Sequence, residues 1–177
     1  MFDARIFLNS LEEARRVLQQ HHAVHKGDYE IVDSIYRSVD ASQPLEKVFL
    51  RLRAVPQNIW DEKPYIVSIK NTELKNVGKQ SIIPIKKQFD TEREAQEYIS
   101  QNHLDNFAYD FVCHRFGEQY FIGEDGVDLE IIEGHPSIEF KSKTEDGLQK
   151  LLQLFNVSAD QVIKGPSVVA IKKILKV

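Results

Sequence analysis

The sequence predicts an α+β fold in which a mostly antiparallel β-sheet carries a few flanking helices. Three observations lead to this prediction. Short segments in which apolar and polar residues alternate recur along the whole chain, as in strands with one buried face. Segments with helical spacing are few, and they do not alternate regularly with the strands as parallel sheets require. About eight strands are expected, which is enough for the sheet to close into a barrel.

The expected strands follow one another along the chain from "FDARIFL" onward. Two late strands flank Gly117, which we interpret as the turn between a pair of strands. Pro84 lies inside another strand, where it predicts an edge or a bulge because proline cannot donate to the ladder. Residues 71–80 are expected to form a loop. The expected strands are 2–8, 29–37, 47–53, 64–70, 81–89, 106–116, 118–123, 127–133 and 137–141.

Helices are expected at four places. Ser10 with Glu13, and Thr91 with Glu94, have the spacing of a capping box at a helix start. The segment "GLQKLLQLF" is strongly amphipathic. The tail "PSVVAIKKILKV" is compatible with a strand or a helix, and we favour the helix. The expected helices are 10–22, 91–102, 147–155 and a tail helix that starts at Pro166.

Length and composition indicate a single domain over residues 1–177. The net charge of −4 does not favour nucleic acid as a partner. Cys113 is the one cysteine, so no disulfide framework can form within the chain, which fits a reducing compartment. The first residues lack the apolar core of a signal peptide, and no apolar run approaches the roughly 18 residues of a membrane span. A cytoplasmic protein without a membrane partner is therefore expected.

The stretch "KVFLRLRAVP" raises the question of what the charged strand faces do. Arg51 and Arg53 share one face of this strand, and Leu50 and Leu52 share the other. Other expected strands repeat the arrangement, with one apolar and one ionisable face. Two interpretations stay open from the pattern alone. The charged faces lie in solvent on a half-exposed sheet, or they line the inside of a closed barrel.

The closed barrel needs a reason to gather Arg51, Arg53, Lys70 and Arg115 in one cavity. Like charges repel one another, and an anionic ligand would remove this penalty. Arginine forks match pairs of phosphate oxygens, and lysine adds a compact charge. Carboxylates on neighbouring strands could hold Mg²⁺ or Mn²⁺ against the same phosphates. A closed barrel with these faces inside therefore predicts a phosphate-bearing ligand.

Several segments, taken in order, resemble the CYTH superfamily, also called the triphosphate tunnel metalloenzymes. "FLRLR" resembles the paired-arginine strand of that family, and "YIVSIK" resembles its next strand with a terminal lysine. "YEIVDSIYR" and "FDTEREAQEYI" resemble its preceding strand and its mid-chain helix. "FVCHRFGEQYFI" and "VDLEIIEGHPSIEF" resemble its late hairpins, which end in an acidic pair. The resemblance implies a closed or nearly closed antiparallel eight-stranded β-barrel, a tunnel, with flanking helices.

The acidic motifs depart from the family pattern. Met1, Asp3 and Arg5 stand where the family opens with Glu-x-Glu-x-Lys, so one carboxylate is missing. "IIPIKKQ" has no acid where the family has a Glu-x-Glu strand, and the late acidic pair is replaced by Glu139 and Lys141. The basic half of the site is therefore better kept than the acidic half. This argues against two-metal catalysis. The remaining acids could still hold one ion, and binding of an anion without turnover is a second possibility.

The resemblance implies a role for each candidate residue. The residues expected to bind a triphosphate are Arg51, Arg53, Lys70, Lys87, Arg115 and Lys141. The residues expected to hold Mg²⁺ or Mn²⁺ are Asp3, Asp128, Glu130 and Glu139. The residues expected to take part in catalysis are Arg5, Lys70 and Glu139. The expected ligand is a small triphosphate or nucleotide.

The activity that the resemblance implies is attack on a phosphoric anhydride. Water as the nucleophile gives a triphosphate hydrolase, and a ribose hydroxyl gives an adenylyl-cyclase-like lyase. A catalytically impaired module that binds an anionic nucleotide or polyphosphate is an alternative, which the depleted acids favour. A third hypothesis is an interaction domain whose charged faces are simply hydrated.

Other residues invite a chemical interpretation. The cluster of His21, His22 and His25 suggests a metal site, although histidines near a helix end are more often exposed. We expect Cys113 to be a buried, inert thiol rather than a nucleophile. Trp60 follows the paired-arginine strand in a polar segment, where it either anchors the loop or covers the mouth of a tunnel.

Overall fold

The chain folds into a closed barrel of antiparallel strands. The structure is a computed structural model that describes residues 1–76, 78–163 and 165–176. Within these residues, eight strands close in a ring in the order β1-β5-β4-β3-β2-β6-β7-β8, accompanied by four helices. The ring is uneven: β2 pairs with β6 over almost its whole length, whereas β1 pairs with β5 at Phe2 and Asp3. The expected α+β barrel with flanking helices is confirmed.

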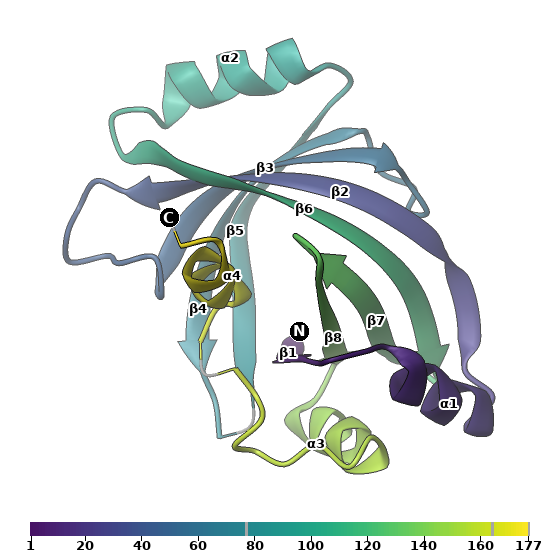
Figure 1. Cartoon of the computed structure of the whole chain (residues 1–177). Coiled ribbons are helices and arrows are strands. Elements are labelled where there is room, and N and C mark those ends of the chain that lie inside the picture. The colour runs from purple at the N-terminus through teal and green to yellow at the C-terminus, as the bar shows by residue number, and fades with distance from the viewer. Residues whose placement is uncertain (77, 164, 177) are drawn as a thin grey trace.

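The barrel strands are long and lie side by side around the ring (Figure 1). The strands are β1 (Phe2–Phe7), β2 (Val24–Ser38), β3 (Val48–Gln57), β4 (Tyr65–Leu74), β5 (Lys79–Phe89), β6 (Phe107–Ile122), β7 (Asp125–Ile132) and β8 (His135–Ser142). The helices are α1 (Glu12–Gln20), α2 (Glu92–Asn102), α3 (Glu145–Leu154) and α4 (Ser167–Leu175).

The expected turn at Gly117 is wrong, because β6 runs through this residue without a break. Gly117 pairs with Tyr29 of β2 on one side and with Glu130 of β7 on the other. A side chain at Gly117 would overlap the Tyr29 ring, so the glycine serves a close contact inside the barrel rather than a turn. The expected loop at 71–80 is also too long, since β4 extends into it and β5 begins before it ends.

The proline in β5 has the predicted effect. The β4–β5 register shifts between Ile69 and Asn71, whose partners are Ile85 and Ile82. Pro84 lies between these two partners, so the strand bulges where the ladder loses a donor. The long strand thereby stays paired on both sides of the proline.

Two of the helix starts follow the sequence closely and one does not. Thr91 and Glu94 form both bonds of the predicted capping box before α2. The tail helix is confirmed as α4, which begins after Pro166. The predicted box at the start of α1 does not form: Ser10 Oγ accepts the Glu12 N–H at 3.1 Å instead, and the helix begins at Glu12, with Leu11 at its N-cap.

The first three helices cover the outer, apolar face of the barrel. Helices α1 and α3 pack on β1, β7 and β8, with Leu18 and Leu148 against Phe140. Helix α2 packs on the opposite part of the ring, with Ile99 near Leu50. The apolar sides of the alternating strands are therefore buried outside, and this leaves the charged sides for the interior.

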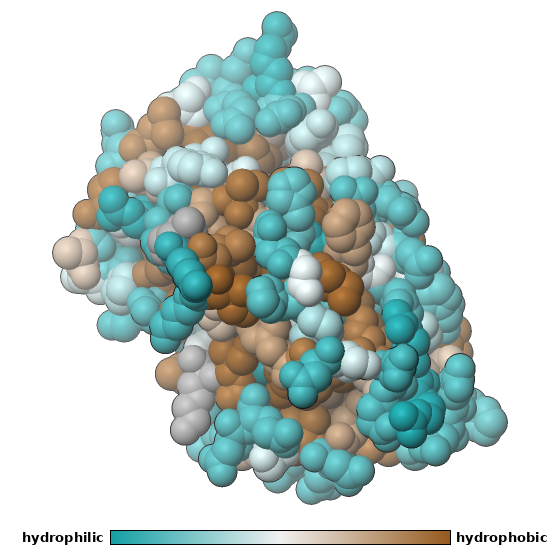
Figure 2. Space-filling view, in the orientation of Figure 1, coloured by the Kyte–Doolittle hydropathy of each residue, from teal (hydrophilic) through white to brown (hydrophobic). Residues whose placement is uncertain are grey.

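Helix α4 differs from the others because it lies within the curve of the sheet (Figure 1). Its Ile171 is buried in an apolar cluster with inward-facing residues of the barrel, including Phe49, Phe111 and Cys113. In the face drawn in Figure 2, apolar side chains gather where α4 lies and polar side chains border them. Among the described residues, no helix is long and apolar enough to cross a membrane.

Candidate anion-binding cavity

A cavity of about 220 Å³ lies inside the barrel. Residues 166–168 and 171 line it at the α4 end, and Tyr29 and Trp60 line it elsewhere. The sequence-predicted residues that line it are Asp3, Arg51, Arg53, Lys70, Arg115, Asp128, Glu130, Glu139 and Lys141. The ionisable strand faces thus lie inside, and the interpretation as a half-exposed sheet with solvated charges is wrong for these residues.

Two predicted residues are placed differently. Arg5 is buried and contacts Glu130 and Glu139, so it supports the wall of the cavity from behind its lining. Lys87 pairs with Val67, whose side chain packs in the outer apolar cluster. Lys87 is exposed and lies on the outside of the barrel, so the structure does not bring it to the cavity.

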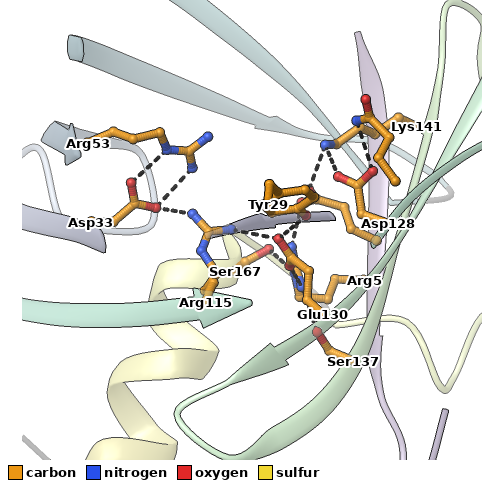
Figure 3. A network of polar contacts seen from close by, with 12 residues as sticks. Arg5, Tyr29, Asp33, Arg53, Arg115, Asp128, Glu130, Ser137, Lys141 and Ser167 are labelled. Carbon is orange, nitrogen blue, oxygen red and sulfur yellow. Dashed lines mark hydrogen bonds and ion pairs between the residues drawn. The ribbon is translucent and has the colours of Figure 1, made fainter. Parts of the chain in front are cut away.

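Asp33 is the cavity residue that sequence reasoning missed. Both of its carboxylate oxygens accept from Arg53, at 2.8 and 2.9 Å, and Oδ2 also accepts from Arg115 (Figure 3). Arg51 Nε lies 3.7 Å from Oδ1. Asp33 lies directly opposite Arg53 in the β2–β3 register. Its inward position in the alternating segment "YEIVDSIYR" was the available signal.

A second carboxylate, Glu130, contacts arginine side chains from two different strands inside the barrel (Figure 3). It accepts from the Tyr29 hydroxyl at 2.7 Å, and it pairs with Arg115 at 3.5 Å and with Arg5. Arg5 also donates to Ser137 at 2.7 Å. Burial raises the pKa of Glu130, but the guanidinium groups of Arg5 and Arg115 outweigh it and hold the pKa below its usual value. Glu130 is therefore an ionised, fully partnered carboxylate.

The carboxylates at the other side of the cavity are paired with lysines. Lys141 Nζ contacts Asp128 and lies 3.2 Å from Glu139. Lys79, in a segment expected to be a loop, contacts Asp3. Burial alone would raise the pKa of Glu139, but the nearby cations, Arg5 first, hold it well below its usual value.

Arg51 and Lys70 are the least compensated cations. Burial lowers the pKa of Lys70 to about 7, and the neighbouring Arg51 adds to the effect. Burial also lowers the pKa of Arg51, and Arg53 repels its charge. The buried side-chain atoms without a hydrogen-bond partner among the described residues include Arg51 Nε and Arg115 Nε. Unsatisfied guanidinium donors of this kind would be satisfied by an anion in the cavity.

The ionisable side chains in and beside the cavity carry a net positive formal charge. Among the described residues, the cations in or beside the cavity are Arg5, Arg51, Arg53, Lys70, Lys79, Arg115 and Lys141. The carboxylates are Asp3, Asp33, Asp128, Glu130 and Glu139. Seven formal positive charges therefore face five negative ones. An enclosed site with an excess of positive charge favours an anionic ligand.

The predicted metal ligands do not fit a divalent cation. Each of the four carboxylates contacts an ammonium or guanidinium group. Across the part of the chain that the structure describes, no three histidine, cysteine, aspartate or glutamate side chains are placed to hold a metal ion. Mg²⁺ and Mn²⁺ need free oxygen ligands, and here these oxygens are occupied by the cations of the protein itself.

The remaining candidates have structural positions of their own. Trp60 lines the cavity, packs its ring 4.8 Å from that of Tyr29 and donates its indole N–H to Gln119 at 3.2 Å. Cys113 also lines the cavity but is almost fully buried, and burial raises its pKa to about 12. His25 bonds to Asp28 at 3.0 Å on the exposed surface.

No protein-family model and no curated protein matches the chain. Its fold is similar to that of PH1819 from Pyrococcus horikoshii OT3, with a TM-score of 0.70, 15% identity and coverage of 97% of this chain and 98% of that one. A proposed adenylate cyclase from Vibrio parahaemolyticus has a TM-score of 0.64 and 13% identity, with coverage of 100% and 99%.

A third structure adds a reported activity. A proposed adenylyl cyclase from Hippeastrum, described as having a dominant triphosphatase activity, has a TM-score of 0.60 and 12% identity, with coverage of 87% of this chain and 85% of that one. At such identities the likeness concerns the fold. The chain shares its fold with these solved structures, two of which are proposed adenylyl cyclases, one of them described with a dominant triphosphatase activity.

Proposed function

We propose that the cavity binds the triphosphate group of a small molecule such as a nucleotide. The observation that carries the proposal is the crowding of cations that lack full compensation inside the barrel. Arg51 has a buried donor without a partner, and the pKa of Lys70 is lowered to about 7 because burial and Arg51 disfavour its charge. A triphosphate would supply the missing negative charge, and its oxygens would accept from guanidinium forks.

The shape of the site supports the same ligand class. The three arginines on β3 and β6 converge on one carboxylate, Asp33, so their guanidinium groups gather around one negative charge, which supports an anionic ligand. Lys70 approaches from β4, next to β3. The described activity of the Hippeastrum protein with this fold makes a triphosphate a reasonable choice among polyanions.

Turnover of the bound triphosphate is a second candidate function, which Lys70 favours. With the anion bound, Lys70 carries a proton, and an ammonium group whose pKa in the free protein is about 7 can act as a general acid. The attacking water or ribose hydroxyl would release its proton to solvent as its oxygen bonds to phosphorus, and Lys70 would donate a proton to the leaving phosphate oxygen. The bond between phosphorus and the leaving phosphate oxygen would break, and the electron pair would leave on that oxygen. Arg5 and Glu139 would act as positioning residues in this step.

One experiment tests both functions. Inorganic triphosphate, ATP and thiamine triphosphate would be titrated into the protein by calorimetry, while release of phosphate and of cyclic nucleotide is followed. The double substitution Arg51→Ala/Arg53→Ala should weaken binding by about a hundredfold or more, because two buried charge-assisted contacts are lost. Arg93→Ala is the matched control, since Arg93 lies on the surface of α2 in an ion pair with Glu97.

The outcomes separate the candidates. Binding that the double substitution removes and Arg93→Ala leaves unchanged supports the binding function. Turnover that is lost in Lys70→Met while binding persists supports catalysis in addition. Equal, weak binding by all three proteins would contradict the proposal.

A further inference from the structure

The carboxylates of the cavity are held by cations that belong to the chain. Asp128 on β7 lies directly opposite Glu139 on β8, so two acidic side chains face each other across neighbouring strands. A pair of this kind is where a divalent cation would be expected to bind. Here the space between them contains the ammonium group of Lys141, which contacts Asp128 and lies 3.2 Å from Glu139.

The charge state of this group is secure. The ammonium group of Lys141 lies against both carboxylates, whose negative charges favour its protonated form. Gln119 donates to the other oxygen of Asp128 at 3.1 Å, so both oxygens of this carboxylate are satisfied by protein groups. Lys141 is therefore a cation at a position between two acids.

Lys79 repeats the arrangement at Asp3. Asp3 of β1 lies opposite Lys79 of β5 on one side and opposite Lys141 of β8 on the other. The Lys79 ammonium contacts one oxygen of Asp3, and Ser81 donates to the other at 3.0 Å. The same ammonium donates to Ser167 of α4 at 3.3 Å. Both lysines line the cavity, next to the space that a ligand would fill.

We propose that Lys79 and Lys141 supply the positive charge that a divalent cation would otherwise supply, so that the cavity binds a triphosphate group without a metal ion. This inference rests on the proposed function. Two ammonium groups carry the same formal charge as one divalent cation and already occupy the oxygens that such an ion would need. A metal ion would have to displace them and would meet their repulsion.

The metal alone provides the first test. Mn²⁺ would be titrated into the full chain and free Mn²⁺ followed by electron paramagnetic resonance. The wild-type protein should bind no Mn²⁺ in the cavity, whereas Lys141→Met removes the ammonium group that Asp128 and Glu139 share and should bind Mn²⁺ at least about tenfold more tightly. Lys143→Met is the matched control, since Lys143 is exposed and pairs with Glu124 on the surface.

Wild-type protein that binds one Mn²⁺, with the ion lost on Asp128→Asn, would overturn the inference. The comparison of wild type with Asp128→Asn needs no lysine variant, so it tests the inference even if Lys141→Met does not fold. Circular dichroism shows whether Lys141→Met is folded. A folded Lys141→Met that binds Mn²⁺ no better than Lys143→Met would also overturn it.

The second test measures inorganic triphosphate binding to the wild-type protein in EDTA and in Mg²⁺. Because Mg²⁺ complexes triphosphate in solution and so competes with a metal-free site, binding in Mg²⁺ should be no tighter than binding in EDTA. Binding about tenfold or more tighter in Mg²⁺ would overturn the inference while leaving the proposed function intact. No binding in either condition would overturn the proposed function and this inference together. In Lys141→Met, binding in EDTA should weaken by about tenfold and be restored in part by Mn²⁺.

Discussion

Asp33 and Arg53 form a two-point ion pair inside the barrel, with both carboxylate oxygens within 2.9 Å of the guanidinium nitrogens. The same carboxylate accepts from Arg115 and lies near Arg51. One acid therefore compensates three arginines in part, in the absence of any ligand. Asp33 stabilises the fold and at the same time competes with an external anion for the same guanidinium groups.

Asp33→Asn should destabilise the free protein and strengthen its response to triphosphate. Removing the carboxylate takes the contacting acid from Arg51 and Arg53 and leaves Arg115 with Glu130, so the free energy of unfolding should fall by about 3 kcal/mol. Triphosphate should then bind about tenfold more tightly, since the internal competitor is gone. Chemical denaturation with and without inorganic triphosphate measures both effects.

Asp90→Asn is the control for this prediction, because Asp90 pairs with Lys63 on the surface. Exposed ion pairs contribute little, so this substitution should change stability by less than about 1 kcal/mol. If Asp33→Asn and Asp90→Asn have equal free energies of unfolding, and triphosphate raises both by the same amount, Asp33 neither stabilises the arginines nor competes with triphosphate for them.

Lys70 predicts a pH dependence of triphosphate binding. Burial, with Arg51 beside it, lowers the pKa of Lys70 to about 7, so at pH 8 the amine of the free protein is mostly neutral. A bound anion raises this pKa, and binding therefore takes up a proton. The affinity should fall as pH rises above 7, by up to about tenfold per pH unit from this group. Calorimetry in buffers of different ionisation enthalpy measures the proton uptake.

The comparison with two variants isolates the contribution of Lys70. Lys70→Met has no titrating amine and Lys70→Arg stays charged, so both should lose this proton uptake. The titration of the ligand itself is common to all three proteins and cancels. Equal proton uptake by the wild type and Lys70→Met would contradict the prediction.

Lys70 should make the free energy of unfolding of the ligand-free protein rise with pH, whereas it makes the triphosphate affinity fall with pH. Between about pH 7 and pH 10 the unfolded chain carries a proton on Lys70 that the folded protein lacks. The unfolded state binds more protons in this window, so the contribution of Lys70 makes the free energy of unfolding rise with pH. Denaturation curves of the wild type and Lys70→Met, taken across this range, should differ in slope; parallel curves would refute the prediction.

Much of the barrel could be predicted because its strands alternate so regularly. A strand such as β3 has one face under a helix and one face toward the cavity, as Leu50 and Arg51 illustrate. Gly117 misled the prediction because its role is a contact with the Tyr29 ring from another strand. Local sequence carries turn preferences, but it does not carry contacts between residues far apart in the chain.

The site could be predicted only in part for a related reason. Alternation indicates which residues face inward, and these did converge on one cavity. It does not set the register between strands, and the register decides that Asp33 meets Arg53 and that Lys79 meets Asp3. The ion pairs that occupy the expected metal ligands were therefore invisible in the sequence. Lys87 was misplaced because it neighbours an inward position in a strand with a bulge.

Gly117→Ala should destabilise the barrel. The added methyl group would overlap the ring of Tyr29, whose hydroxyl is held by Glu130 at 2.7 Å and cannot move freely. Overpacking of this kind should lower the free energy of unfolding by about 2 kcal/mol. Gly126→Ala is the control, because its methyl group would meet the Lys141 side chain at an ordinary 3.6 Å. Equal stability of the two variants in urea denaturation would contradict the assignment of Gly117.

The thiol of Cys113 should be inert in the folded protein. The residue is 1% exposed, and burial raises its pKa to about 12, so at pH 8 only about one thiol in ten thousand is ionised. A disulfide reagent such as Ellman's reagent should label the native protein only as fast as it opens, and should label the chain in guanidinium at once. Bound triphosphate should slow native labelling further, because it stabilises the folded state. Native labelling as fast as that of the denatured chain would mean that the thiol is accessible from the cavity. Cys113→Ala should keep its triphosphate affinity, because an un-ionised thiol adds no charge to the cluster of arginines around it.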